Sequence, residues 1–414
     1  MARILYLSNK DSIFSYMFFA FVYIIVPLVY YYVGKRLIEP ATFNRGQKAV
    51  AWLIILFVFL LPYSSRYLRR YNISDSWAEI LLNAGYISLG FFGILFITIV
   101  TRDVMLALVW LVRKVGKIVE NITRANSRFT DTPQNMERRR FLVHSSNLGL
   151  LVLSGGLTGY GIHEATTPPG IVRVSVPVKN LPKDIEGFRI VQITDLHVGH
   201  TIKQKYVAGV VKIANELNPD ILALTGDLAE GRPSSLRQDV ACLSELQAKS
   251  GKFFVTGNHE YYHGVNGWLK EIHRLGFQVL MNSHLVIERG TARLLVAGVP
   301  DPQAHRFDPN HAPDLRKTLK DAPECHVRIL LAHRPQAIFE SSQHGFDLQL
   351  SGHTHGGQIF PFNYMLLLRE PYISGLHLHH KTWIYVSRGT GVWGPPMRLG
   401  APAEVTEITL VKAV

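Results

Sequence analysis

The sequence is poor in cysteine, and its first 165 residues are poor in acidic side chains and in histidine. Only two cysteines, Cys242 and Cys325, occur in 414 residues. This excludes a disulfide framework and a zinc site built from four cysteines. One bridge and two free thiols both remain open for this pair. The chain also lacks internal repeats and low-complexity runs.

Charge and apolar residues are distributed unevenly. Residues 1–165 hold 18 Lys and Arg against 9 Asp and Glu, whereas residues 166–414 hold 26 against 22. Most of the net charge of +13 therefore belongs to the apolar part of the chain. Positive charge beside long apolar runs is typical of membrane topology, so we expect no nucleic-acid partner. The histidines have the opposite distribution, with 17 of 18 at or after position 163.

Long apolar stretches predict an all-α membrane domain over residues 1–165 and a second domain over residues 166–414. A transmembrane helix needs about 20 apolar residues, and we expect about four helices, at residues 13–34, 49–65, 80–101 and 141–162. The second stretch is short. The fourth is rich in Gly and Ser, and a buried helix or a signal-type segment is its alternative. The run 104–112 is either an extension of the third helix or an interfacial helix.

Loop charges predict the orientation of these helices. With four spans, residues 34–48 and 102–140 share one side and hold 4 and 9 Lys and Arg. The opposite side holds 2 before the first span and 3 in residues 66–79. The excess of positive charge places residues 102–140 in the cytoplasm. We therefore expect a multi-pass protein of the plasma (inner) membrane, with everything after residue 165 on the extracytoplasmic side.

A basic motif precedes the fourth apolar stretch. Residues 137–142 read ERRRFL, and Arg138-Arg139 followed by Phe141-Leu142 resembles a bacterial twin-arginine export signal. The motif is internal rather than N-terminal. A plain basic membrane flank is the alternative.

From about Val172 onward the pattern is that of a soluble α/β domain. Helix-like stretches at 203–217, 235–248 and 266–275 separate short apolar runs rich in Val, Ile and Leu, which are typical of buried strands. These runs cover residues 188–194, 220–225, 252–256, 293–299, 328–332, 346–350 and 382–386.

Polar side chains stand at the ends of five of these runs. Sites in open α/β sheets form at the carboxyl ends of strands. One Asp after a strand is often a turn or a helix cap, but five such ends in succession predict a metal site. Gly226, Gly257 and Gly352 suit the tight turns that aim the side chains. The candidate metal ligands are Asp195, His197, Asp227, Asn258, His333, His353 and His355.

These ligands form an oxygen and nitrogen shell without sulfur, which suits Mn, Fe, Zn or Co. Seven side chains, one of them shared, are enough for two divalent metal ions. Two metals together can activate a bridging hydroxide for attack at phosphorus. His259, next to Asn258, is then available as a catalytic acid.

The motif series resembles the calcineurin-like metallophosphoesterase superfamily. The series is D-x-H, G-D, G-N-H-E, a lone His and G-H-T-H, in that order, over about residues 185–410. The stretches DLHVG (195–199), GHTHGGQIFP (352–361) and SRGTGVWGPPMRLGAPAEVTEITL (387–410) are similar to the branch of membrane-tethered bacterial phosphodiesterases. The N-terminal part resembles the version of that branch with a multi-span membrane domain.

The resemblance implies a fold and a role for each residue. The expected fold is a four-layer αββα sandwich, in which two mixed β-sheets are covered by helices on both sides. Asp227 would bridge the two metals, and His259 would contact the phosphate and protonate the leaving oxygen. The first metal would be held by Asp195, His197 and His355, and the second by Asn258, His333 and His353.

The implied activity is hydrolysis of phosphodiester or pyrophosphate bonds. Residues 364–368, YMLLL, are apolar for a loop near a site; if exposed they would contact a bilayer or an acyl chain, and if buried they are core. A lipid-linked phosphoester is therefore a candidate substrate. A non-catalytic membrane sensor or scaffold and a transporter are the alternatives. His259 disfavours the sensor, and the lack of charge inside the spans, with only Asp103 at an edge, disfavours the transporter.

Overall fold

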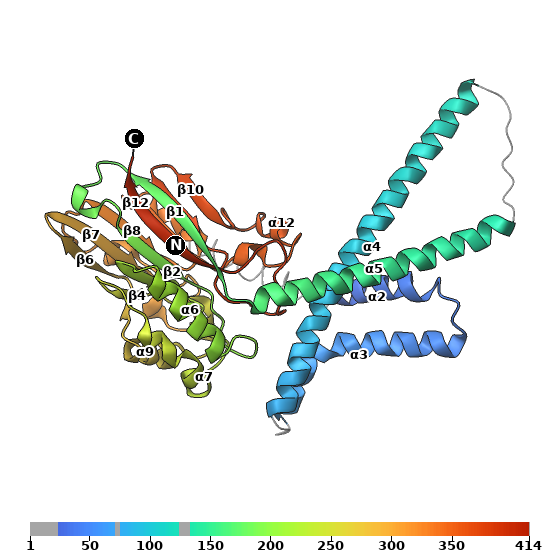
Figure 1. Cartoon of the computed structure of the whole chain (residues 1–414), viewed down its shortest axis with the longest axis horizontal. Helices are drawn as coiled ribbons and strands as arrows, with labels where there is room; N and C mark the ends of the chain where they lie inside the picture. The colour runs from blue at the N-terminus through green and yellow to red at the C-terminus, as the bar shows by residue number, and fades with distance from the viewer. Residues whose placement is uncertain (1–23, 71–74, 124–132, 414) are drawn as a thin grey trace. The chain divides into compact units, whose positions relative to one another are not determined.

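The computed structural model describes residues 24–70, 75–123 and 133–413. The chain divides into two compact units, Met1–Tyr160 and Gly161–Val414. The first unit is helical, and the second contains all the strands of the described residues (Figure 1).

The helical unit contains three stretches that are long and apolar enough to cross a membrane: Arg45–Ser64, Glu79–Gly116 and Glu137–Thr166. They lie in α3, α4 and α5, which also contain the expected spans 49–65, 80–101 and 141–162. Residues 104–112 continue α4 without a break, so this run is an extension of the third helix. Of the expected first span, residues 13–23 lie outside the described residues, and α2 overlaps the rest. The helices are α2 (Val26–Ile38), α3 (Arg45–Arg70), α4 (Asp75–Thr123) and α5 (Pro133–Thr166).

A polar cluster joins helices inside this unit. Asp103 lies in α4, within the 38-residue apolar stretch Glu79–Gly116 and just beyond the end of the expected span 80–101. Its carboxylate oxygens lie 2.7 Å from Arg36 Nε and 3.0 Å from Arg102 Nη2, and Tyr32 Oη donates to it at 2.5 Å. Each charge therefore has a partner, as charged groups in apolar surroundings require.

The second unit contains two six-stranded mixed sheets. In the first, β2, β3, β4 and β5 run parallel, whereas β12 is antiparallel to β2 and parallel to β1. Its order is β1 (Gly170–Val178), β12 (Glu404–Lys412), β2 (Arg189–Ile193), β3 (Ile221–Leu224), β4 (Lys252–Phe254) and β5 (Gln278–Val279).

In the second sheet, β7, β8, β9 and β11 run parallel, and the edge strands β6 and β10 are antiparallel to their neighbours. Its order is β10 (Gly375–His379), β11 (Thr382–Val386), β9 (Leu348–Ser351), β8 (Val327–Leu331), β7 (Ala292–Gly298) and β6 (Ser283–Arg289).

The main apolar core lies between the two sheets. Alternate residues of the central strands face it, such as Ile190 and Ile221 of the first sheet and Val296 and Ile329 of the second. Burying one such side chain contributes roughly 1.5–3 kcal/mol. This alternation is what a strand buried on both faces requires, because successive side chains point to opposite faces of a sheet.

The opposite face of each sheet is covered by helices. Val191 and Leu222 pack against the helices of the first sheet, α6 (Gln204–Glu216), α7 (Pro233–Val240) and α9 (Val265–Arg274). On the second sheet, the outward-facing residues pack with the short helices α10 (Leu315–Thr318) and α11 (Ile338–Ser341). The predicted αββα fold class is therefore confirmed.

Candidate metal centre

Of the eight residues predicted for the site, seven come together from both sheets in groups of converging ligand atoms, and Asn258 is the neighbour of one of them. Asp195 and His197 follow β2, and Asp227 follows β3. Asn258 and His259 open the short helix α8 (Asn258–Tyr262) after β4. From the second sheet, one residue follows β8 and two follow β9, namely His333, His353 and His355.

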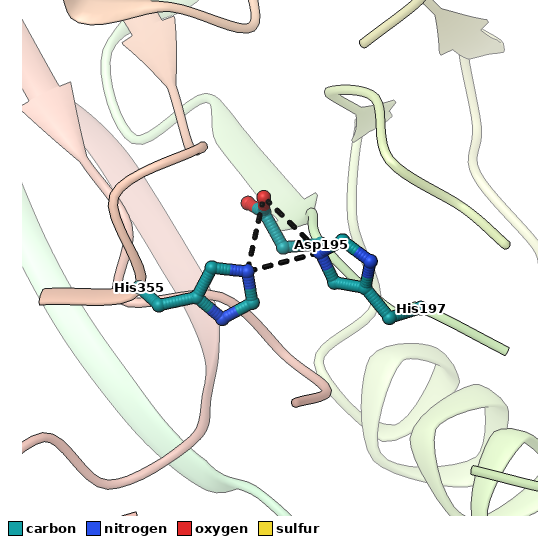
Figure 2. A group of neighbouring side chains, drawn as sticks. All are labelled: Asp195, His197 and His355. Carbon is teal, nitrogen blue, oxygen red and sulfur yellow. Dashed lines mark hydrogen bonds and ion pairs between the residues drawn. The ribbon is translucent and has the colours of Figure 1, made fainter. Parts of the chain in front are cut away.

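One group of ligand atoms belongs to Asp195, His197 and His355. One ligand atom from each lies within 4.8 Å of the others, and Figure 2 shows the three side chains pointing toward one another. His197 Nε2 and His355 Nε2 are 3.0 Å apart, and they lie 3.9 and 3.5 Å from Asp195 Oδ1. All three side chains are buried. Three ligand atoms thus converge on one point inside the protein.

A second group contains Asp227, His333 and His353. His333 Nδ1 donates to the backbone carbonyl of Thr225 at 2.8 Å, so its Nε2 is the ring nitrogen that faces Asp227. This Nε2 is buried without a hydrogen bond and lies 3.1 Å from Asp227 Oδ2. A buried ring nitrogen without a hydrogen-bond partner is available as a metal ligand.

The amide oxygen of Asn258, also predicted for this group, accepts a hydrogen bond from Arg334 Nη2 at 3.2 Å. A carbonyl oxygen has two lone pairs, so one remains for a metal. Arg334 is itself fixed, because its Nε donates to Asp301 Oδ2 at 2.7 Å and both side chains are buried. The ion pair Arg334–Asp301 therefore orients the Asn258 amide.

The Asp227 carboxylate lies between the two groups. Its Oδ2 is 3.1 Å from His333 Nε2 in the second group and 3.9 Å from His197 Nε2 in the first. The same oxygen lies 3.9 Å from His259 Nε2, while Oδ1 accepts from the His259 backbone N–H at 2.9 Å. Asp227 thus touches both groups and the candidate acid.

Glu230 is a further member of the site that the sequence analysis missed. Its Oε1 lies 2.9 Å from His259 Nδ1 and also contacts His197 Nδ1, and its Oε2 lies 3.5 Å from His263 Nε2. Glu230 therefore connects a candidate ligand with the candidate acid. Its position three residues after Asp227, in GDLAEG, is the only sequence signal for it.

Backbone strain gathers at these residues. Among the described residues, eleven non-glycine residues have a positive φ in the left-handed region, and five of them are candidate ligands. Such a conformation costs of order 1–3 kcal/mol and persists where the surroundings impose it. The five are Asp195, His197, Asp227, His353 and His355, with φ between 48° and 70°.

Two glycines allow the loops to approach the ligands closely. A Cβ at Gly352 would lie 2.1 Å from Asp195 Oδ2, and a Cβ at Gly257 would lie 2.1 Å from Asp227 Oδ1. Gly226 differs, because it also needs the left-handed conformation with φ of 89°. Close approach, more than turn geometry, is the reason for the first two glycines.

Burial and charge divide the imidazoles into two kinds. Burial, together with nearby cationic groups, holds the pKa of His353 and His355 well below its ordinary value, so both rings are neutral. For His259, burial lowers the pKa, but Asp227 and Glu230 outweigh this and raise it to about 9. The first two rings suit metal ligation, and His259 suits proton donation.

Asp227 and His333 form an oppositely charged buried pair. Burial raises the pKa of the Asp227 carboxyl, but the surrounding imidazoles outweigh this and hold it well below its ordinary value. Burial lowers the pKa of His333, and carboxylates, led by Asp227, raise it to about 10. A metal ion displaces the proton when it binds such an imidazole. The carboxylates that stabilise the protonated ring would therefore also stabilise a bound cation.

Arg398 is another residue that the sequence analysis missed. It is 1% exposed, its Nη1 donates to the Ala401 carbonyl at 2.8 Å, and its Nη2 lies 3.2 Å from His355 Nδ1. A guanidinium has five donors, and here they hold the loop beside the first ligand group. The donor set of the whole centre, with carboxylates, imidazoles and one amide but no sulfur, fits divalent cations of the Mn, Fe, Zn or Co type.

This fold with this group of side chains defines a metallophosphoesterase domain. The family model for calcineurin-like phosphoesterases matches residues 188–357. A transmembrane protein with metallophosphoesterase domain from Danio rerio is 31% identical, over 98% of this chain and 91% of that protein. An uncharacterised metallophosphoesterase from Campylobacter jejuni is 31% identical, over 95% of this chain and 98% of its own length.

A solved phosphopantetheinyl hydrolase from Mycobacterium tuberculosis is also similar, at 14% identity and a TM-score of 0.33, over 51% of this chain and 91% of that chain. The chain belongs to the calcineurin-like metallophosphoesterase family, whose members are metal-dependent phosphoester hydrolases.

Proposed function

We propose that the protein is a membrane-anchored phosphoesterase that uses two divalent metal ions to hydrolyse phosphodiester or pyrophosphate bonds. The position of Asp227 carries the proposal. Its Oδ2 lies within 3.9 Å of a candidate ligand atom in each of the two groups, which suits one carboxylate shared by two cations. The family membership supports hydrolysis of a phosphoester.

In this proposal, one cation would be held by Asp195, His197 and His355 and the other by Asn258, His333 and His353, with Asp227 available to both. When bound, the two cations supply positive charge that neutralises phosphate oxygens and makes a water molecule more acidic.

The chain's own residues supply the remaining steps. His259 is 8% exposed and carries a proton on its ring, because Asp227 and Glu230 stabilise its charged form. It donates that proton to the oxygen of the leaving group as the bond to phosphorus breaks. Glu230, 2.9 Å from His259 Nδ1, holds the ring with Nε2 directed toward Asp227.

A non-catalytic sensor or scaffold that binds a phosphorylated ligand is the second candidate. A binding domain needs the cations but has no need of a proton donor. The contact between His259 and Glu230 favours the enzyme, because it prepares a charged imidazole beside the centre.

The test uses the full-length protein in lipid nanodiscs, freed of metal and then given MnCl2. Hydrolysis of bis(4-nitrophenyl) phosphate is expected only after the metal is added, and Asp227→Ala is expected to abolish it. Asp308→Ala, at a carboxylate outside the site, serves as the control. Metal-dependent tight binding of inorganic phosphate without any turnover would support the sensor instead. The same assay with Fe, Zn and Co salts identifies the preferred metals.

We further propose that residues 1–165 form the membrane domain and residues 166–414 the catalytic domain, on the extracytoplasmic face of the inner membrane. The three candidate spans and the loop charges support this. Alkaline phosphatase fused after residue 414 is expected to be active, and green fluorescent protein fused there through the general secretion route is expected to be dark. The reverse pattern would overturn the orientation. Export that depends on Arg138 and Arg139 would support the twin-arginine-like motif.

A further inference from the structure

Residues 360–368 form an exposed apolar segment beside the metal centre. Helix α12 (Asn363–Leu366) has no buried residue. Leu368 is 89% exposed and Tyr364 is 60% exposed, so this segment is not part of the core. Six large apolar residues of this nine-residue segment are exposed: Phe360, Phe362, Tyr364, Met365, Leu367 and Leu368. A concentration of this kind marks an interaction surface.

The segment is connected directly to the metal centre. It begins after Gln358, which follows the loop that carries His353 and His355. Gln358 Nε2 donates to the Trp393 carbonyl at 2.7 Å, and Trp393 N donates to Gln358 Oε1 at 3.0 Å. The Trp393 ring is half-exposed and lies 6.3 Å from the His259 ring. Gln358 thus links the ligand loop, the apolar segment and an aromatic side chain next to the candidate acid.

The chain itself indicates what covers this surface. The candidate span Glu137–Thr166 ends four residues before β1 begins at Gly170. An extended chain covers at most about 3.6 Å per residue, so this connection is at most about 15 Å long. With Glu137–Thr166 as a membrane span, this short connection would keep the α/β unit close to the bilayer surface. A bilayer is an apolar partner that is always within reach of this unit.

We propose that residues 360–368 insert into the outer part of that bilayer, and that the metal centre acts on a lipid-linked phosphoester taken from it. The phosphate of a lipid lies at the boundary between water and hydrocarbon, which is where an apolar segment next to a metal centre would place the site. Trp393 suits the same boundary, because indole rings favour the interface. This proposal rests on the proposed phosphoesterase function for its substrate, but its lipid contact does not.

The lipid contact is tested first, without catalysis. In a full-length Cys242→Ala, Cys325→Ser background in nanodiscs, Leu368→Cys is labelled with an environment-sensitive nitrobenzoxadiazole dye. Leu285→Cys is the control, because Leu285 is 41% exposed on β6, and Figure 1 shows β6 at the opposite end of the α/β unit from α12. We expect nitroxide-labelled lipids to quench the dye at position 368 and not at position 285. Equal quenching at both positions, or none at 368, would overturn the proposal. A blue shift without lipid quenching would assign the surface to another protein or a second copy.

The substrate is tested with two diesters that differ only in chain length, hexadecyl 4-nitrophenyl phosphate and methyl 4-nitrophenyl phosphate. Both lose 4-nitrophenol to water by the same chemistry. We expect Leu367→Ser with Leu368→Ser to lower the hexadecyl-to-methyl ratio of kcat/KM by about tenfold, and Leu285→Ser to leave it unchanged. An unchanged ratio in the double variant would overturn the proposal. If the wild-type protein hydrolyses neither diester, the proposed function fails while the quenching result still decides the lipid contact.

Discussion

The two units of this chain treat their large apolar side chains in opposite ways. In the helical unit many of these side chains face outward, as Leu53 and Phe57 of α3 do at 62% exposure each. In the α/β unit they fill the layers between sheets and helices, as Ile190 and Val296 do at 0%. The first arrangement suits lipid as the solvent, and the second suits water.

The polar residues of the two units differ in the same sense. In the helical unit, Asp103 is neutralised by Arg36 and Arg102. In the α/β unit, buried carboxylates and imidazoles converge in groups that could hold a metal ion. The comparison indicates that the first unit anchors and the second performs chemistry. Residues 360–368 are the exception, because they belong to the second unit but are exposed like the first.

The largest expected effect separates chemistry from anchoring. His259→Gln is expected to lower the rate by about 10³-fold for a diester with an alkyl leaving group. The loss is expected to be much smaller for 4-nitrophenol, which leaves without a proton. Membrane insertion and metal content should not change. His305→Gln, at an exposed histidine, is the control. An equal loss for both leaving groups would contradict the role of His259 as an acid.

The second prediction compares glycines of the two units. Gly352→Ala places a Cβ 2.1 Å from Asp195 Oδ2, so the ligand loop has to move. A displacement of about 1 Å costs about 10²-fold in rate. Gly209→Ala in α6 and Gly155→Ala in α5 have open space around the new Cβ and are expected to keep full activity. Full activity of Gly352→Ala would show that the loop geometry does not matter.

The third prediction concerns stability. Removing the metals with EDTA leaves the buried carboxylates and imidazoles without their cations. A metal ion present at 100 times its dissociation constant adds about 2.7 kcal/mol to the free energy of unfolding. Without it, the α/β unit should melt about 5–10 °C lower. Differential scanning calorimetry of the protein in nanodiscs is expected to show this shift. The helices of the helical unit, followed by circular dichroism, should unfold at a higher temperature than the α/β unit. This transition should not depend on EDTA. A shift of both transitions would indicate that the units do not unfold independently.

The smallest effect concerns Glu230 as a positioning residue. Glu230→Gln removes a carboxylate that, with Asp227 and against burial, raises the pKa of His259 to about 9. The acid form of His259 is lost as pH rises through this pKa. The variant has a lower pKa, so its activity should fall at lower pH than that of the wild type, with about a tenfold loss near neutral pH. Glu340→Gln, on α11 outside the site, is the control. An unshifted pH profile would make Glu230 merely structural.

The sequence allowed the fold class, the central strands and the candidate ligands to be predicted, for a physical reason. Strands β2, β3, β7, β8 and β11 are buried on both faces and therefore read as continuous apolar runs. The candidate ligands follow such runs directly in the sequence, so their positions after the strands were enough to predict that they lie close together.

What the sequence did not reveal depends on partners far along the chain. Strands β1 and β6 are half-exposed and contain polar residues, so they lack an apolar run. Glu230 and Arg398 lie near recognised motifs, but no local pattern assigns them a role, because their function comes from contacts with His259 and His355.

The most direct test of the account is the metal content of the purified full-length protein, measured by inductively coupled plasma mass spectrometry together with hydrolysis of bis(4-nitrophenyl) phosphate. We predict about two divalent ions per chain, with activity that rises as the second ion binds. Asp227→Ala, which removes the shared ligand, should lose both the second ion and the activity. Full activity with one ion per chain, or with none, would contradict the two-metal centre.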